Sequence, residues 1–132
     1  MDGDSVAEPK LLPPSMREPK RYIVFEAISE SPVNYGDLMN AIWSSMLSFL
    51  GENGSSEANI WIIQNLYDEQ AQRGVIKCRH TSVEEMRVIL SLIQYIGETK
   101  AMIRILGVTG TIKSAKNKYL TPNTLGEENA RL

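Results

Sequence analysis

The chain has 132 residues, of which 42% are hydrophobic and 23% charged, and its formal net charge is -2. These values are typical of one globular domain and exclude a disordered chain, a fibre or a coiled-coil rod. The longest uncharged stretch, residues 38–51, is too short for a transmembrane helix, which needs ~20 apolar residues, and residues 1–20 contain no apolar signal segment. A single cysteine excludes an internal disulfide and favours a reducing compartment, so we expect a cytoplasmic protein.

Charge is distributed unevenly along the chain. Residues 1–9 contain three acids and no base, whereas residues 10–120 carry a net charge of +2. Residues 10–21 carry +3, and residues 100–120 carry +5 with no acid. Bases grouped in two short segments are typical of a surface that binds an anionic partner, although solvated surface charge gives the same pattern.

Both ends of the chain differ in composition from its centre. Pro9, Pro13, Pro14 and Pro19 disfavour helix in residues 1–20, which predicts an extended, basic, proline-rich arm. The last twelve residues are polar and acidic, which predicts a flexible tail over residues 121–132. A single domain is expected between them, over residues 21–120.

The first strand and helix are predicted close to the start of this domain. Residues 22–28 are rich in β-branched and aromatic side chains, which indicates a largely buried strand. Asn34 is a candidate N-cap, and Asp37 stands in the first turn, where the helix dipole favours an acid. The apolar residues that follow recur at spacings of three and four, which predicts an amphipathic helix that ends near Gly51. A loop is expected over residues 52–56.

The remaining elements continue the alternation of strands and helices. In chain order they are strands over residues 60–66 and 75–79, a helix whose apolar face runs from Met86 to Ile96, a strand over residues 100–108 and a short basic helix over residues 112–120. The first two strands should form an antiparallel hairpin. A capping box, either Thr81 with Glu84 or Ser82 with Glu85, should start the helix, and Gly97 should end it.

This order, β-α-β-β-α-β, predicts an α/β fold of the α+β sandwich type. It corresponds to the ferredoxin-like arrangement, which RNA-recognition domains share. We expect a four-stranded antiparallel sheet with the first and third strands in the middle, two helices on one face, and a short C-terminal helix in addition.

Strand alternation decides which side chains face away from the two helices. The outward set is Tyr22, Val24, Glu26 and Ile28 from the first strand, Val75, Lys77 and Arg79 from the third, and Met102, Arg104, Leu106 and, as an open assignment, Val108 from the fourth. A face with Tyr22 as its one aromatic residue argues against base stacking; it favours a protein partner, contacts to an RNA backbone, or both. Trp43 and Trp61 are interpreted as core or interface anchors.

The sequence contains no convincing set of residues for catalysis by the protein itself. His80 is the one histidine and lies between a strand and a helix cap, and Cys78, the one cysteine, is expected to be buried toward the helices. Glu84 and Glu85 are explained by helix capping. These counts also exclude a four-ligand zinc site of the usual kind. We therefore predict no catalytic residue, and no metal or cofactor bound by the protein.

Several segments, in their order and spacing, resemble one known family. They are residues 12–18 (LPPSMRE), 20–23 (KRYI), 41–43 (AIW), 49–51 (FLG), 74–78 (GVIKC), 104–113 (RILGVTGTIK) and 118–120 (KYL). The chain is similar in these segments to archaeal ribonuclease P protein component 2 and to its eukaryotic relatives in ribonuclease P and in the mitochondrial-RNA-processing ribonuclease. The resemblance covers residues 9–120.

The resemblance implies a protein subunit of ribonuclease P, the ribonucleoprotein that removes the 5′ leader from precursor tRNA. It implies that the RNA subunit carries the hydrolysis, with magnesium ions at the RNA active site. The protein is expected to bind the catalytic half of that RNA together with ribonuclease P protein component 3, in a two-plus-two assembly around a self-dimer. Other ribonuclease P proteins and precursor tRNA are expected as indirect partners, and a membrane is not.

Two sets of residues are assigned to these partners. The basic residues expected to bind RNA are Lys10, Arg17, Lys20, Arg21, Lys77, Arg79, Arg104, Lys113, Lys116 and Lys118. The residues expected to meet component 3 are Val75, Met102 and Leu106, with Trp61 as a neighbour. The alternative function is a ferredoxin-like regulatory domain that binds a small molecule, but such a domain needs neither the basic arm nor the acid-free C-terminal segment.

Overall fold

The computed structural model describes residues 19–58 and 60–120. Its main elements are β2 (Lys20–Ser29), α1 (Tyr35–Ala58), β3 (Trp61–Ile62), β4 (Arg73–Arg79), α2 (Val83–Ser91), β5 (Tyr95–Ile96), β6 (Thr99–Thr109) and α3 (Ile112–Ala115). Short 3-10 turns occupy Gln64–Leu66 and His80–Ser82, and α3 continues into a π-helical turn, Lys116–Leu120. We refer to residues 112–120 as the C-terminal helical segment. The fold is mixed α/β, as predicted.

The described strands form one antiparallel sheet of five strands in the order β3-β4-β2-β6-β5. The first and third predicted strands, β2 and β4, lie inside the sheet, as expected. The prediction of four strands is wrong, because Tyr95–Ile96 forms an additional short strand that pairs with the start of β6. Gly97, at φ +62°, serves the tight turn between these two strands, where a positive φ is needed, and does not cap a helix.

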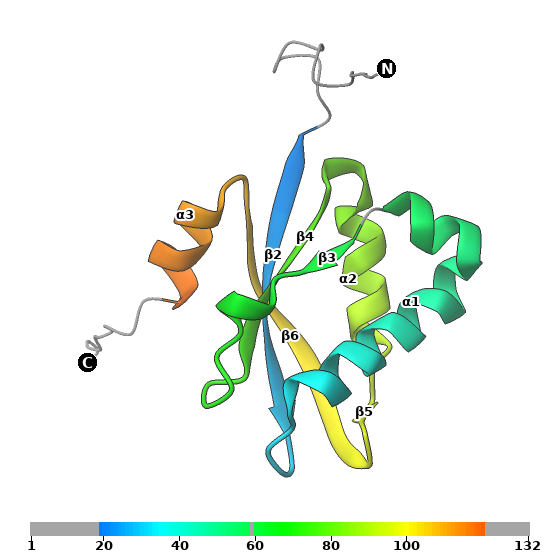
Figure 1. Cartoon of the computed structure of the whole chain (residues 1–132), viewed down its shortest axis with the longest axis vertical. Helices are drawn as coiled ribbons and strands as arrows, with labels where there is room; N and C mark the ends of the chain where they lie inside the picture. The colour runs from blue at the N-terminus through cyan, green and yellow to red at the C-terminus, as the bar shows by residue number, and fades with distance from the viewer. Residues whose placement is uncertain (1–18, 59, 121–132) are drawn as a thin grey trace.

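Helices α1 and α2 cover one face of the sheet, and α3 lies on the other side (Figure 1). The main core lies between the sheet and the two long helices, and its largest fully buried members include Phe25, Leu38, Ile42 and Ile89. Phe25 packs directly against the backbone of β4, because a Cβ at Gly74 would lie 2.7 Å from its ring. The prediction that two helices cover one face of the sheet is confirmed.

Helix α1 starts where the sequence predicts. The Oδ1 atom of Asn34 accepts a hydrogen bond from the backbone N–H of Asp37 at 2.8 Å, which satisfies one of the free donors of the first turn. The predicted end near Gly51 is a bend: Gly51 has φ +74° and ψ 177°, and the chain resumes a helical course to Ala58. The loop expected over residues 52–56 is therefore wrong.

Two other predictions were wrong in detail. The second predicted strand, residues 60–66, is a strand only at Trp61–Ile62 and then turns into a 3-10 helix. Helix α2 ends at Ser91, and its N-cap residue, Ser82, makes no side-chain capping bond, so the predicted capping box is absent at Ser82. The preceding 3-10 turn, His80–Ser82, leads the chain into the helix in its place.

The sheet face opposite α1 and α2 is partly covered by the chain itself. The C-terminal helical segment packs on it, with Val24, Val75 and Ala115 all fully buried in a second, smaller core. Thr111 caps α3 by accepting a hydrogen bond from Ser114 N at 3.1 Å. This face is therefore not an open sheet, in contrast to the prediction.

Candidate functional site

The candidate site is the sheet face on the side of α3, which we call the charged face. Cross-strand pairs carry the predicted alternation: Tyr22 pairs with Lys77, and Glu26 pairs with Arg73 and with Arg104. A β-bulge between Val24 and Phe25 shifts the register of β2 against β6. As a result Val108, whose side was left open, packs against the main core.

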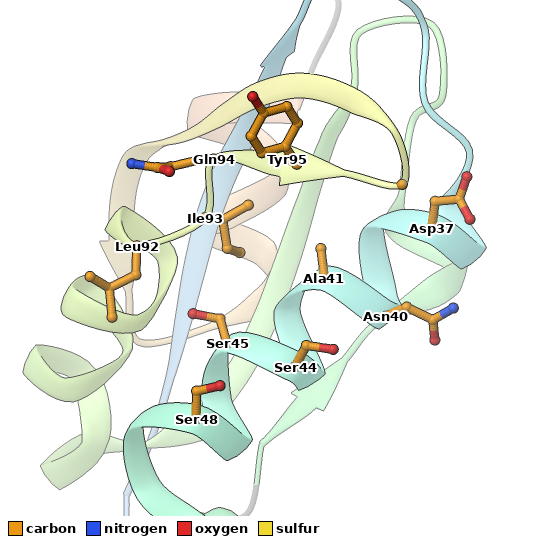
Figure 2. A pocket seen from close by; sticks show the side chains of 11 residues that line it. Asp37, Asn40, Ala41, Ser44, Ser45, Ser48, Leu92, Ile93, Gln94 and Tyr95 are labelled. Carbon is orange, nitrogen blue, oxygen red and sulfur yellow. The ribbon is translucent and has the colours of Figure 1, made fainter.

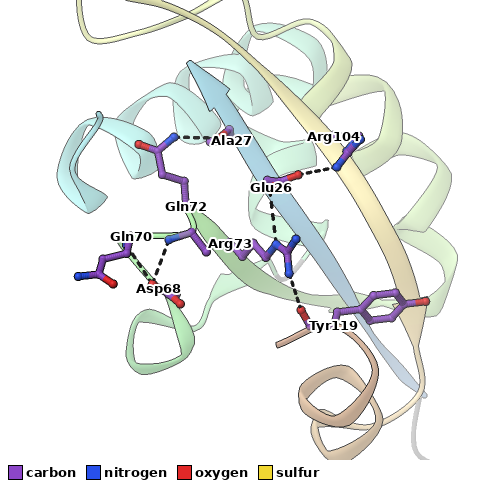
Figure 3. A network of polar contacts seen from close by, with 9 residues as sticks. Glu26, Ala27, Asp68, Gln70, Gln72, Arg73, Arg104 and Tyr119 are labelled. Atoms are coloured by element: carbon purple, nitrogen blue, oxygen red, sulfur yellow. Dashed lines mark hydrogen bonds and ion pairs between the residues drawn. The ribbon is translucent and has the colours of Figure 1, made fainter. Parts of the chain in front are cut away.

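A carboxylate with two arginines occupies the middle of the charged face. Glu26 Oε1 accepts a hydrogen bond from Arg104 Nη2 at 2.7 Å, and Glu26 Oε2 lies 3.5 Å from Arg73 Nε (Figure 3). The Glu26 side chain is 20% exposed, whereas the Arg104 side chain is 58% exposed. The carboxylate therefore fixes both arginines from the central strand and neutralises part of their charge.

Arg73 also connects this cluster to the C-terminal helical segment. Its Nη1 donates to the backbone oxygen of Tyr119 at 3.2 Å (Figure 3). The Tyr119 ring lies over Gly107, where an added Cβ would overlap the ring and hydroxyl. Arg73 is absent from the predicted site residues, because the predicted strand begins at Val75; extending the alternation by two residues would place Arg73 on the same face as Val75, and the register of β4 on β2 then puts it beside Glu26.

The turn before β4 is held by a second polar cluster that the sequence did not indicate. Gln72 adopts φ +55°, and its Nε2 donates to Ala27 O at 2.8 Å and to Ser29 Oγ at 3.0 Å. Its Oε1 accepts from Val33 N at 2.8 Å. Gln72 thus joins the end of β2, the entry to α1 and β4, and Figure 3 shows its bond to Ala27.

The basic residues predicted to bind RNA fall into several places. Lys10 and Arg17 lie outside the described residues. Lys20 and Arg79 pair in register beside Lys77 on the charged face, and Arg104 is bound to Glu26. Arg21 pairs with Cys78 on the opposite face and donates to Lys20 O at 2.8 Å. The three lysines of the C-terminal helical segment, Lys113, Lys116 and Lys118, are exposed.

The residues predicted to meet a protein partner do not form one patch. Val75 is fully buried within the chain, so the expectation that it is exposed is wrong; the C-terminal helical segment covers it. Leu106 is half-buried beside the same segment. Met102 is 53% exposed and Trp61 67% exposed, but β4 and β2 separate their strands. Neither Trp61 nor Trp43, which is 37% exposed, is a core residue.

Cys78 and His80 do not form a nucleophile with its base. Cys78 is fully buried in the main core, and burial raises the pKa of its thiol to about 11, although nearby Lys20 lowers it somewhat. Because the thiolate is the reactive form, such a thiol is inert near neutral pH. His80 is exposed at the end of β4. The arrangement at these two residues therefore supports no covalent catalysis.

A hollow of about 520 Å³ lies between α1 and the chain from the end of α2 to β5 (Figure 2). Ser44 and Ser48 line it from α1, and Tyr95 lines it from the other side. Asp37 is the one charged side chain among the described residues of its lining. Small hydroxyl groups without a charged cluster give a small ligand few directional contacts, so this hollow does not favour the regulatory-domain alternative.

Within residues 19–58 and 60–120, no three His, Cys, Asp or Glu side chains come together as a metal site would require. No helix in the same part of the chain is long and apolar enough to cross a bilayer.

A mixed α/β fold with exposed cations at one sheet face and on a C-terminal segment has a charge distribution that suits an anionic partner. Comparison with protein families is more specific. The chain belongs to the Rpp14/Pop5 family, whose family model matches residues 21–120.

Relatives of the chain are similar over most of their length. The protein is 43% identical over 113 residues to "Ribonuclease P protein component 2" of Pyrococcus furiosus, covering 86% of this chain and 92% of the relative. It is 40% identical over 123 residues to the protein of the same name from Methanosarcina barkeri, covering 93% and 87%. The fold is also similar to a chain in "Cryo-EM structure of yeast Ribonuclease MRP", with a TM-score of 0.57, 8% identity, and coverage of 72% and 76%.

Proposed function

We propose that this chain is a non-catalytic, RNA-binding protein subunit of ribonuclease P, the ribonucleoprotein that removes the 5′ leader from precursor tRNA. The observation that carries the proposal is the 43% identity to a ribonuclease P protein component 2 over 92% of that relative. The exposed lysines of the C-terminal helical segment support it, because exposed cations on one segment suit contacts to phosphates.

The proposed division of labour assigns the chemistry to the RNA. Phosphodiester hydrolysis needs an activated water and a stabilised leaving oxygen, and magnesium ions bound by the RNA would supply both. The protein's part is positioning: Lys113, Lys116 and Lys118 reduce repulsion between phosphates of the catalytic half of the RNA. The folded RNA then persists at a lower magnesium concentration.

We propose ribonuclease P protein component 3 as the direct protein partner, in a two-plus-two assembly with a self-dimer at its centre. Ile28 and Met102 pair in register and are 42% and 53% exposed, so they form a contiguous apolar patch. The neighbouring Glu26–Arg104 ion pair gives this patch a charged border. An apolar centre with a charged rim is the usual composition of a protein interface.

Salt dependence of RNA binding tests the proposal. Replacing Lys113, Lys116 and Lys118 together by Ala should flatten the plot of log K against log salt by about 0.7–0.9 per lost phosphate contact, the values for DNA taken as a guide. Lys100→Ala, which removes an exposed lysine at the far end of β6, is the control and should leave the slope unchanged. An unchanged slope in the triple variant would exclude this segment from the RNA contact.

Reconstituted cleavage tests the division of labour. The catalytic RNA with this protein and component 3 should process precursor tRNA at a magnesium concentration at which the RNA alone is inactive. His80→Ala should keep turnover within a few-fold of the wild type, because His80 is exposed and outside the charged face. Loss of cleavage by His80→Ala at saturating magnesium, in a complex that still assembles, would place the protein in the chemistry.

A further inference from the structure

An aromatic side chain stands exposed at one edge of the charged face. Trp61 is 67% exposed, the highest value among the large apolar side chains of the described residues. It pairs in register with Lys77, which pairs in turn with Tyr22. Since directly opposed residues of an antiparallel pair point to the same side, these three side chains form one row across β3, β4 and β2.

The charge beside this row is positive. Lys20 and Arg79 form the next cross-strand pair toward the end of the sheet. The nearest acid on the three strands is Glu26, which lies four residues along β2 from Tyr22 on the same face. Glu26 is bound to Arg73 and Arg104. The surroundings of Trp61 on this face therefore favour an anionic ligand.

A hollow adjoins Trp61 at the outer edge of β3. It has a volume of about 690 Å³, and its lining includes Trp61, Ile63, Gln64 and Asn65. The Gln64 and Asn65 side chains are exposed, and an amide offers both hydrogen-bond donors and an acceptor. Aromatic and amide groups thus line this hollow, and the cation next to it is Lys77, the cross-strand partner of Trp61 on β4.

We propose that Trp61 is a stacking platform for an unpaired RNA base, with Lys77 and Lys20 contacting the flanking phosphates. The ligand class is single-stranded RNA, because the bases of a duplex are stacked on each other and cannot cover the indole. A protein partner seated on Trp61 would have to supply an acid for Lys77, because covering that charge without a partner is costly, whereas the phosphates of RNA supply the negative charge themselves. This inference rests on the proposed function and names the kind of RNA element that the charged face takes.

Tryptophan fluorescence of the full chain gives a direct test. The chain has two tryptophans, so Trp43→Phe leaves Trp61 as the single reporter. Oligoadenylate should quench this signal, whereas a blunt RNA duplex of the same length should quench it little. Trp61→Ala should weaken oligoadenylate binding about 5- to 150-fold, and Trp61→Phe should restore most of the affinity. Because Trp61 is exposed, both variants should keep the circular dichroism spectrum of the folded protein.

Three results would overturn the inference. Wild-type affinity of Trp61→Ala for oligoadenylate excludes stacking, and so does a wild-type chain that does not bind oligoadenylate, because stacking platforms tolerate any base. Loss of component 3 binding by Trp61→Ala, with unchanged oligoadenylate binding, assigns the residue to a protein interface. A different result would contradict the proposed function. That result is a wild-type chain that does not help the catalytic RNA to cleave precursor tRNA at low magnesium, and it is independent of the Trp61 variants.

Discussion

The two faces of the sheet differ in what covers them. On the side of α1 and α2, seventeen buried residues of the described chain form one core, and cations are largely absent from it. On the side of α3, the buried core consists of Val24, Val75 and Ala115, and the rest of the face carries ion pairs and exposed cations. The first face supplies most of the apolar burial that stabilises the fold, and the second keeps charged groups within reach of a partner.

The largest effect is expected on the helix-covered face. Phe25→Ala removes a fully buried ring and should lower the free energy of unfolding by about 3–5 kcal/mol, measured by urea denaturation. Met102→Ala, an exposed apolar side chain of the charged face, is the control and should change stability by less than about 0.5 kcal/mol. Similar losses of unfolding free energy in the two variants would contradict the larger contribution of the helix-covered face to stability.

A smaller effect is expected where the C-terminal helical segment covers the charged face. Gly107→Ala places a methyl group against Tyr119, so the segment should dock less well, at a cost of about 1–3 kcal/mol. Trypsin should then cut faster after Lys116 and Lys118. Gly110→Ala is the matched control, since an added Cβ there meets no atom within 4 Å. Equal cleavage rates in the two variants would contradict the tight contact at Gly107.

The ion cluster should contribute less than either packing contact. Glu26→Gln removes the charge that binds Arg73 and Arg104, and because both arginines are partly exposed to water the expected loss is about 1 kcal/mol. The control is Glu84→Gln: Glu84 is 86% exposed beside Arg87, and its loss should be too small to measure. A neutral effect of Glu26→Gln would show that the cluster adds no stability.

The smallest effect concerns RNA binding by Arg104. Glu26 already accepts a hydrogen bond from Arg104 at 2.7 Å. Arg104→Ala should therefore change the salt slope of RNA binding by less than the value for one phosphate contact, which is about 0.7–0.9. Lys113 is exposed, so Lys113→Ala should change the salt slope by about the full value for one phosphate contact. If both variants flatten the slope equally, Arg104 exchanges Glu26 for a phosphate when RNA binds.

Local patterns of the sequence predicted the main strands and their faces well. Alternation placed Tyr22, Lys77 and Arg104 on the side away from α1 and α2, and Asn34 caps α1 as expected. The side on which a strand residue lies and the residue that caps a helix depend on neighbours within a few residues, so both can be predicted from local sequence patterns. The family is equally well predicted, since it depends on the order of short segments.

Features that depend on contacts between distant segments were not predictable in this way. The burial of Val75 depends on where residues 112–120 dock, and the side of Val108 depends on a bulge opposite Val24. The strand at Tyr95–Ile96 forms because α2 ends early, and no periodicity signals so short a strand. Sequence alternation also could not reveal that Trp61 remains exposed beside Lys77, which required the register of β3 on β4.

The central position of β2 has a consequence for biosynthesis. Ile23 pairs with Ile76 on one side and with Val108 on the other, so both neighbours of this strand are translated long after it. At about 5–20 residues per second, the ribosome needs roughly 4–17 s to reach Val108 after Ile23. During this time the apolar residues of β2 have no partner strand on the β6 side. Among the described strands, β2 is therefore exposed for the longest time during synthesis, and the risk of aggregation at its apolar residues falls only when β6 has emerged.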